Sequence, residues 1–273
     1  MLNRVKKYTY SFQISIRNSI EYRFDFVTSF LFKFLPVFIN FFLWKIIYLS
    51  SGGIIETIKG MTLNRVVSYI IIIQFVDALI SPDGVDFKVM SEIKEGELSK
   101  YLLKPINYFS YNLSLIVAKK VLFIPPVIAT YVIVSLLFHE YIVLYQGLVD
   151  ILLFIPALLL AFFIRYYIAI ILGLIGFFLT EVSSLYIMTN RIILFLSGML
   201  FPLVFLPDTL LTVFSCLPFY YITYFPSMIA IGALNVKEIL FGYCISTIWF
   251  VGLYIIAVIM WRIGLKKYES VGG

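Results

Sequence analysis

Six charged side chains lie within or at the edge of long apolar runs, where a charge is energetically unfavourable. An uncompensated charge at the centre of a bilayer costs at least about 2.5 kcal/mol, so each needs a partner, a path to the interface or a function. Lys45 lies near the outer end of its run and can extend to the interface. The other candidates for substrate binding, energy coupling or structural pairing are Lys33, Asp77, Arg165, Glu181 and Arg191.

Pairing can neutralise four of these charges. Lys33 and Asp77 are each about two turns from the same end of adjacent antiparallel runs, so they can meet. Glu181 and Arg191 can pair across the turn between two later runs. Arg165 is the deepest and has no obvious partner in the sequence.

Motifs for catalysis are missing from the sequence. His139-Glu140 begins like a zinc hydrolase motif, but His139 is the only histidine. Cys216 and Cys244 are too few and too far apart for a disulfide framework or a cysteine metal site. Without paired carboxylates or a Gly-x-Ser-x-Gly motif, no catalytic, cofactor-binding or metal residue can be named for an intramembrane enzyme.

Composition places these charges in a membrane domain. The chain has 273 residues, of which 62% are hydrophobic and 13% are charged, whereas soluble domains carry about 25% charged residues. The net charge of +6 comes from Lys and Arg scattered at the ends of apolar runs, a pattern that indicates membrane topology rather than nucleic-acid binding. The sequence predicts one all-α polytopic membrane domain over 25–273.

Apolar runs long enough to cross a bilayer as helices need about 20 residues. The run at 148–179 would reach roughly 48 Å as one helix, with Arg165 in its middle, so it is either one projecting helix or two crossings. Counting it once gives six spans, at about 26–49, 64–80, 113–138, 148–179, 185–200 and 239–261.

Charge distribution decides between these alternatives. With six spans and both ends in the cytoplasm, most of the 21 Lys and Arg residues lie inside, and only Lys59, Arg65 and Lys237 lie outside. A seventh crossing would put Arg262 and its basic neighbours outside. The positive-inside rule therefore favours six spans, in the plasma membrane.

Two further segments have patterns of their own. Apolar residues at spacings of three and four predict an amphipathic interfacial helix over 1–24. The apolar segment 201–236 carries four prolines within 25 residues and cannot be a straight span. It predicts short re-entrant helices in the outer leaflet; the alternative is an outer loop packed on the bundle.

The polar stretch 81–112 predicts a helical hairpin. Ser81, Pro82 and Asp83 resemble a capped helix start, and Gly96 a helix end. A hairpin of mixed charge can dock a partner, or it can be a solvated connector. Its first helix should have one apolar face and one ion pair, made by Val85, Val89 and Ile93 and by Lys88 and Glu92 respectively.

The string IKEGELSKYLLKPI at 93–106 resembles the loop after the second span of ABC-2-type transporter permeases, in which I-x-x-G-x-L-x-x-x-L-L-(K/R)-P recurs. Gly-Phe-Phe at 176–178 and the proline-containing strings at 196–207 and 217–226 are similar to that family's fifth span and re-entrant segment. The matches follow the family's order from about 90 to 235.

The resemblance implies a permease subunit that pairs with a second permease chain, identical or different. Separate cytoplasmic ATPase subunits would bind the ATP, and this sequence has no G-x-x-x-x-G-K-(S/T) phosphate loop. The family's coupling helix would correspond to 83–104. Residues expected at the ATPase contact, with the carboxylates facing water, are Glu92, Lys94, Glu95, Glu97 and Lys100.

The cargo and one competing function follow from broader features. Clustered aromatic residues in 219–225 favour a lipophilic or amphipathic cargo such as a lipid, peptide or drug. Six spans with buried charges would also suit an ion-coupled secondary transporter. That class predicts inverted repeats with paired broken helices, but the broken segment occurs only in the second half.

Overall fold

The computed structural model describes residues 23–50, 57–82, 84–143, 148–179 and 183–268, and side chains from 35 onward, apart from 148–150 and 183. Within these ranges the elements are helical, with one isolated bridge between Ile58 and Met61. The predicted interfacial helix at 1–24 lies almost wholly outside the described residues. The all-α prediction is therefore confirmed for the described chain.

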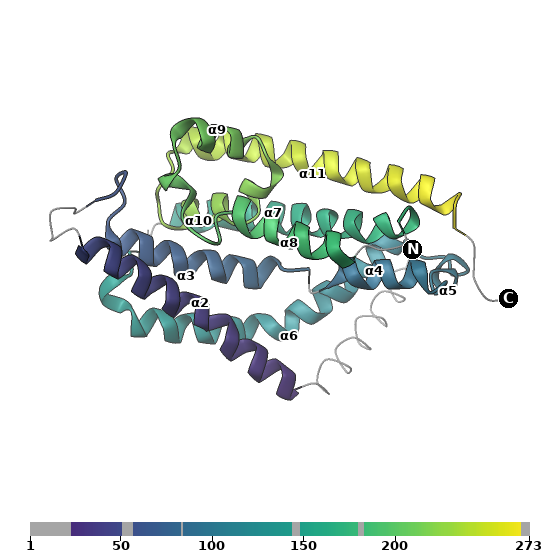
Figure 1. Ribbon diagram of the computed structural model, residues 1–273, viewed down its shortest axis with the longest axis horizontal. Coiled ribbons are helices and arrows are strands. Elements are labelled where there is room, and N and C mark those ends of the chain that lie inside the picture. Colours follow the sequence, from purple (N-terminus) through teal and green to yellow (C-terminus); the bar gives the residue numbers. More distant parts are fainter. Residues whose placement is uncertain (1–22, 51–56, 83, 144–147, 180–182, 269–273) are drawn as a thin grey trace.

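Long helices run roughly along one axis of the molecule (Figure 1). They are α2 (Arg23–Ser50), α3 (Leu63–Ile80), α6 (Tyr108–Leu137), α7 (Leu148–Leu174) and α11 (Val236–Leu265). Their exposed faces are rich in large apolar side chains; Leu136, Phe241 and Ile248 are each at least 66% exposed. Apolar residues that remain exposed on a helix of this length belong against lipid.

Four helical stretches are long and apolar enough to cross a membrane: Leu63–Lys94, which joins α3 and α4 across position 83 outside the described residues, and Tyr108–Leu137, Ile151–Phe177 and Val236–Leu265. A fifth is possible if one bent helix pair counts as a span. The structure thus supports four to five spans where six were predicted. The first predicted span falls on α2, a helix of 28 residues whose side chains are described from Leu35 to Ser50, and at the fifth predicted span the described apolar helix is Ser184–Leu196.

The run at 148–179 forms a single continuous helix. α7 continues directly into a 3₁₀ turn, η2 (Ile175–Phe177), and the chain does not reverse at Arg165. This confirms the interpretation of the run as one helix. Arg165 lies 12 residues before Phe177, which places it about 18 Å from that end of the helix.

α7 is the centre of the packing. It contacts α11, α10 (Tyr224–Ala230) and α4 (Val85–Lys94), and α3 packs on α2, α6 and α10. Small residues permit the closest approaches: a Cβ added at Gly242 would overlap the ring of Phe225, which joins α11 to α10. Each of the other long helices therefore touches α3 or α7, which form the core.

The proline-containing segment is a chain of short helices. It comprises η3 (Leu203–Phe205), α9 (Asp208–Ser215), η4 (Pro218–Tyr221) and α10, with an 82° bend between α9 and the helices that follow. Gly198, at φ 81°, turns the chain out of α8 (Ser183–Leu196), and Tyr69 donates to its carbonyl at 2.8 Å. The prediction of broken helices is confirmed; their depth in a membrane remains a prediction.

The hairpin at 81–112 has a different start from the predicted one. Ser81 ends α3, and its N–H bonds to the carbonyl of Asp77. Pro82 disfavours helical backbone at the residue before it, and Ser81 is extended, at φ −54° and ψ 131°. α4 then begins at Val85 with Gly84 as its N-cap. Gly96 at φ 74° closes the helix as predicted, and a short helix α5 (Ser99–Leu102) follows.

Candidate functional site: a buried polar network and a polar-lined cavity

Loops that the charge pattern placed on one side of the membrane gather at one end of the molecule. Figure 1 shows α4, α5 and the C-terminal end of α11 together at the right, whereas η1 (His139–Tyr141) and α9 lie toward the left. The hairpin 81–112 therefore caps the end of the bundle at which α11 ends.

The apolar face of α4 is seated on the end of α7. Val85, Val89 and Ile93 are at most 6% exposed, which confirms the predicted face. A Cβ added at Gly173 would lie 2.6 Å from the Cβ of Val89 and 2.9 Å from the carbonyl oxygen of Asp86. The backbones of α4 and α7 approach closely at this point, and only glycine leaves the space for it.

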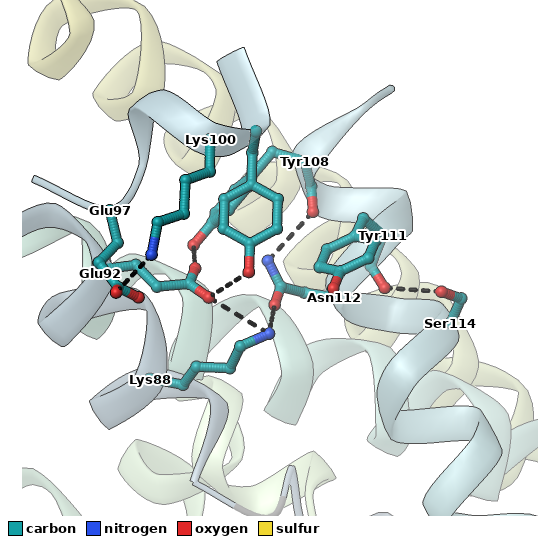
Figure 2. A network of polar contacts seen from close by, with 9 residues as sticks. Lys88, Glu92, Glu97, Lys100, Tyr108, Tyr111, Asn112 and Ser114 are labelled. Carbon is teal, nitrogen blue, oxygen red and sulfur yellow. Dashed lines mark hydrogen bonds and ion pairs between the residues drawn. The ribbon is translucent and has the colours of Figure 1, made fainter. Parts of the chain in front are cut away.

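On its other face, α4 carries a buried carboxylate at the centre of a polar network (Figure 2). Glu92 is 5% exposed. Tyr108 donates to its Oε2 at 2.5 Å, Tyr101 donates to its Oε1 at 3.0 Å, and Lys88 Nζ lies 3.5 Å from Oε1. Lys88 also donates to Asn112 Oδ1 at 3.0 Å. The predicted Lys88–Glu92 pair is confirmed.

The expectation that Glu92 faces water is wrong. Its acceptors are occupied by hydroxyls from α5 and α6, which fold back over α4 after Gly96. The periodicity of α4 alone gave Glu92 a polar face, but it did not show that Tyr101 and Tyr108 cover that face. Glu92 therefore holds the hairpin together and is not available to contact an ATPase subunit.

Electrostatics fix the direction of these hydrogen bonds. Burial and the Glu92 carboxylate both raise the pKa values of Tyr101 and Tyr108 above their usual range, so both hydroxyls keep their protons and donate. Burial lowers the pKa of Lys88, and the nearby Glu92 carboxylate opposes that shift. The network is a charge pair with two neutral donors.

The network is tied to the membrane helices by aromatic and backbone contacts. Trp261 of α11 stacks on Tyr108 with ring centroids 4.8 Å apart and planes 14° from parallel. Tyr166 of α7 donates to the carbonyl of Phe109 at 2.6 Å. The Ser99 N–H donates to the hydroxyl of Tyr268 at 3.2 Å. The hairpin, α7 and α11 thus form one packed unit.

The remaining predicted contact residues lie at the rim. Lys94, Glu95 and Lys100 are exposed, and Glu97 pairs with Lys100 at 2.6 Å. Sequence reasoning missed the most exposed apolar residue of the rim: Leu103, at 87%. Its place directly before Lys104 and Pro105, where α5 has ended, was the available signal.

A second site lies deeper, between α3, α7 and α8. A cavity of about 380 Å³ is lined by polar residues from all three helices, and its other lining residues are aliphatic or methionine. The structure thereby brings together three of the predicted intramembrane charges. The side chain of Lys33 and all of Glu181 lie outside the described residues, so their predicted pairs stay predictions. The polar residues of the lining are Asp77, Arg165, Tyr186, Asn190 and Arg191.

Arg165 has one long hydrogen bond in this cavity. Its Nη2 donates to Asn190 Oδ1 at 3.5 Å, while its Nε and Nη1 are buried without a hydrogen-bond partner in the described chain. Sequence reasoning considered only charged partners for Arg165 and therefore missed Asn190, which lies on α8, 25 positions after Arg165. A permanently charged guanidinium is left with unused donors.

Comparison with known proteins gives one result. The profile of a family described as ABC-2 family transporter protein matches residues 34–272. The match includes the seat of α4 and the cavity at Arg165. A search of curated proteins gave no matching relative.

Proposed function

The chain belongs to the ABC-2 family of transporter proteins, and on this premise we propose that it is the permease subunit of an ATP-driven exporter. Separate cytoplasmic subunits would bind and hydrolyse the ATP. Two permease chains, identical or different, would line the export path. The cargo would be lipophilic or amphipathic, a proposal that rests on the aromatic composition of 219–225, although Tyr224 and Phe225 are themselves buried in the core, each 2% exposed.

The observation that carries this proposal is the construction of the hairpin 81–112. A permease without a nucleotide site must receive mechanical work through a cytoplasmic surface. Here α4 is packed on Gly173 of α7 and locked to α6 through Glu92, so a push on the hairpin is delivered to the core helix. Leu103 and the Glu97–Lys100 pair are exposed at the tip, where an ATPase subunit can reach them.

The competing ion-coupled transporter fits less well. Such folds place broken helices in corresponding positions of two repeats. Among the described residues one bent helix pair passes the length and composition test for a span, and it lies in the second half, at Asp208–Ser215 and Pro218–Ala230. The buried charges alone do not favour that function.

Leu103, at the exposed tip of the hairpin, should be required for binding of the ATPase subunit. Leu103→Asp places a charge where an apolar contact is expected, and loss of one central contact residue typically costs at least about 2 kcal/mol, or roughly thirtyfold in affinity. A tagged chain purified from its host should carry an ATP-hydrolysing subunit, identified by mass spectrometry, and the variant should lose it.

Val236→Asp is the matched control for Leu103→Asp. Val236 is 65% exposed at the opposite end of the molecule, and aspartate is favourable at a helix start. It should retain the ATPase subunit. Nucleotide hydrolysis by the purified chain alone, or equal capture by both variants, would contradict the proposal.

We also propose six crossings with both chain ends in the cytoplasm. Lys100 and Lys237 are exposed at opposite ends of the bundle, at the hairpin and at the start of α11. After replacement of Cys216 and Cys244 by serine, a membrane-impermeant thiol reagent on intact cells should label Lys237→Cys and not Lys100→Cys. The opposite labelling would invert the topology, and labelling of both would rule out six spans.

A further inference from the structure

The cavity between α3, α7 and α8 has the features of a ligand site that the fold does not fill. Its volume of about 380 Å³ falls within the range of small-molecule pockets. Charged and polar groups converge on it from three helices, and aliphatic side chains complete the wall. A site with both polar and aliphatic walls suits a molecule with a polar head and an apolar body.

Arg165 has hydrogen-bond donors in the cavity that lack acceptors within the described chain. A guanidinium carries five N–H donors and stays charged at any physiological pH. The described chain gives it one acceptor at 3.5 Å, and its Nε and Nη1 are buried without any. Buried charged donors without acceptors are costly, so an acceptor that enters the cavity would be bound strongly.

The charges around Arg165 favour an anion of low charge. The lining contains the guanidinium groups of Arg165 and of the exposed Arg191, and one carboxylate, that of Asp77. Asp86, on α4, also attracts Arg165, although its own Oδ1 accepts from the Phe87 N–H at 3.0 Å. Within the lining, guanidinium groups outnumber carboxylates two to one, and guanidinium pairs in a forked geometry with carboxylate or phosphate.

We propose that this cavity binds the carboxylate or phosphate headgroup of an amphipathic molecule, with Arg165 as the main ligand and Asn190 and Arg191 as supporting groups. The headgroup could belong to a bilayer lipid or to the exported cargo. That the bound molecule is cargo rests on the proposed export function; the binding itself does not.

The hairpin touches the same cavity. Phe87 of α4 contacts Tyr186, which lines the cavity, with ring centroids 6.4 Å apart. Asp86, next to it, is the group on α4 that attracts Arg165. A displacement of α4 would therefore change both the shape of the cavity and the charge that Arg165 experiences, which links headgroup binding to the coupling surface.

Titration of the purified full chain in neutral maltoside micelles tests the proposal. Dodecyl phosphate should bind saturably, and dodecylphosphocholine, which has no net charge, should bind at least about tenfold more weakly. Arg165→Gln should weaken dodecyl phosphate binding at least about tenfold, and Arg165→Lys less. The affinity for inorganic phosphate, measured in the same way, shows how much of the binding comes from the headgroup alone.

Asp77→Asn separates a binding defect from a folding defect. It removes the carboxylate that opposes the anion, so it should tighten dodecyl phosphate binding, which a damaged fold would not do. Arg262→Gln, an exposed arginine at the end of α11, should leave binding unchanged. Equal affinities of the wild type and Arg165→Gln, or weaker binding by Asp77→Asn, would overturn the proposal.

Lipid extracts of the same preparations identify the source. If anionic lipid is enriched with the wild type and lost with Arg165→Gln, the ligand is a bilayer lipid. If dodecyl phosphate binds but no anionic lipid copurifies, the ligand is an exported amphiphile. Because the titration needs no ATPase subunit, its failure would leave the export proposal standing, and failure of ATPase capture would not affect it.

Discussion

Glu92→Ala should destabilise the hairpin 81–112 by about 3 kcal/mol, more than removal of any other carboxylate there. The substitution deprives the hydroxyls of Tyr101 and Tyr108 of their acceptor and leaves the ammonium of Lys88 without its counterion. Thermal unfolding in maltoside micelles should show a clearly lower melting temperature. Glu92→Gln should be intermediate, because an amide oxygen can still accept from one tyrosine.

Glu95→Ala is the matched control on the same hairpin. Glu95 is exposed, and its carboxylate accepts from the hydroxyl of Ser91, so the change should stay within about 0.5 kcal/mol. Tyr108→Phe in the Glu92→Ala background should cost less than in the wild type, because the bond is already lost. If Glu92→Ala and Glu95→Ala melt alike, the network does not stabilise the hairpin.

This result also fixes how docking can be tested. Charge reversal at Glu92 would disrupt the hairpin itself, so loss of ATPase binding by such a variant would say nothing about a direct contact. Reversal at Glu95 and Glu97, which lie at the rim, changes the surface while keeping the buried network.

Gly173→Val should unseat α4 from α7. The new Cβ would lie 2.6 Å from the Cβ of Val89, and 2.9 Å from the backbone oxygen of Asp86, which cannot rotate away. α4 must shift, and an overpacked contact of this kind costs typically about 1–3 kcal/mol. In the complex with its ATPase subunits, nucleotide hydrolysis should be uncoupled from conformational changes of the membrane domain.

Gly252→Ala is the control for Gly173→Val. A Cβ at Gly252 of α11 would have no neighbour within 4 Å, and alanine favours a helix over glycine by about 1 kcal/mol. It should be neutral or slightly stabilising. Val89→Ala combined with Gly173→Ala should recover little of the loss, because alanine at position 89 keeps the Cβ that lies 2.6 Å from the added atom. Wild-type melting and coupling in Gly173→Val would disprove the role of this seat.

Sequence alone was sufficient for features set by local periodicity. The buried face of α4 followed from Val85, Val89 and Ile93, and the Lys88–Glu92 pair from a spacing of four. The length of the run at 148–179 and the charge distribution gave one helix for α7, and prolines gave the broken segment after Gly198.

Features that depend on contacts between distant segments could not be read in this way. Glu92 is buried because two tyrosines, 9 and 16 positions later, fold back over it. Arg165 meets Asn190 only because α7 and α8 are brought side by side. The start of α4 was misplaced because a serine followed by a proline can end one helix as well as begin another, and here Ser81 ends α3.

The network around Glu92 has a consequence for synthesis of the chain. Its partners are at most 24 positions apart, so the hairpin can close as soon as Asn112 has left the ribosome. The apolar face of α4, however, waits for Gly173, about 60 residues later, which is roughly 3–12 s at the usual rate of translation. During that interval the hairpin of the nascent chain exposes the apolar face of α4. The membrane surface or a chaperone must cover this face until α7 has been synthesised.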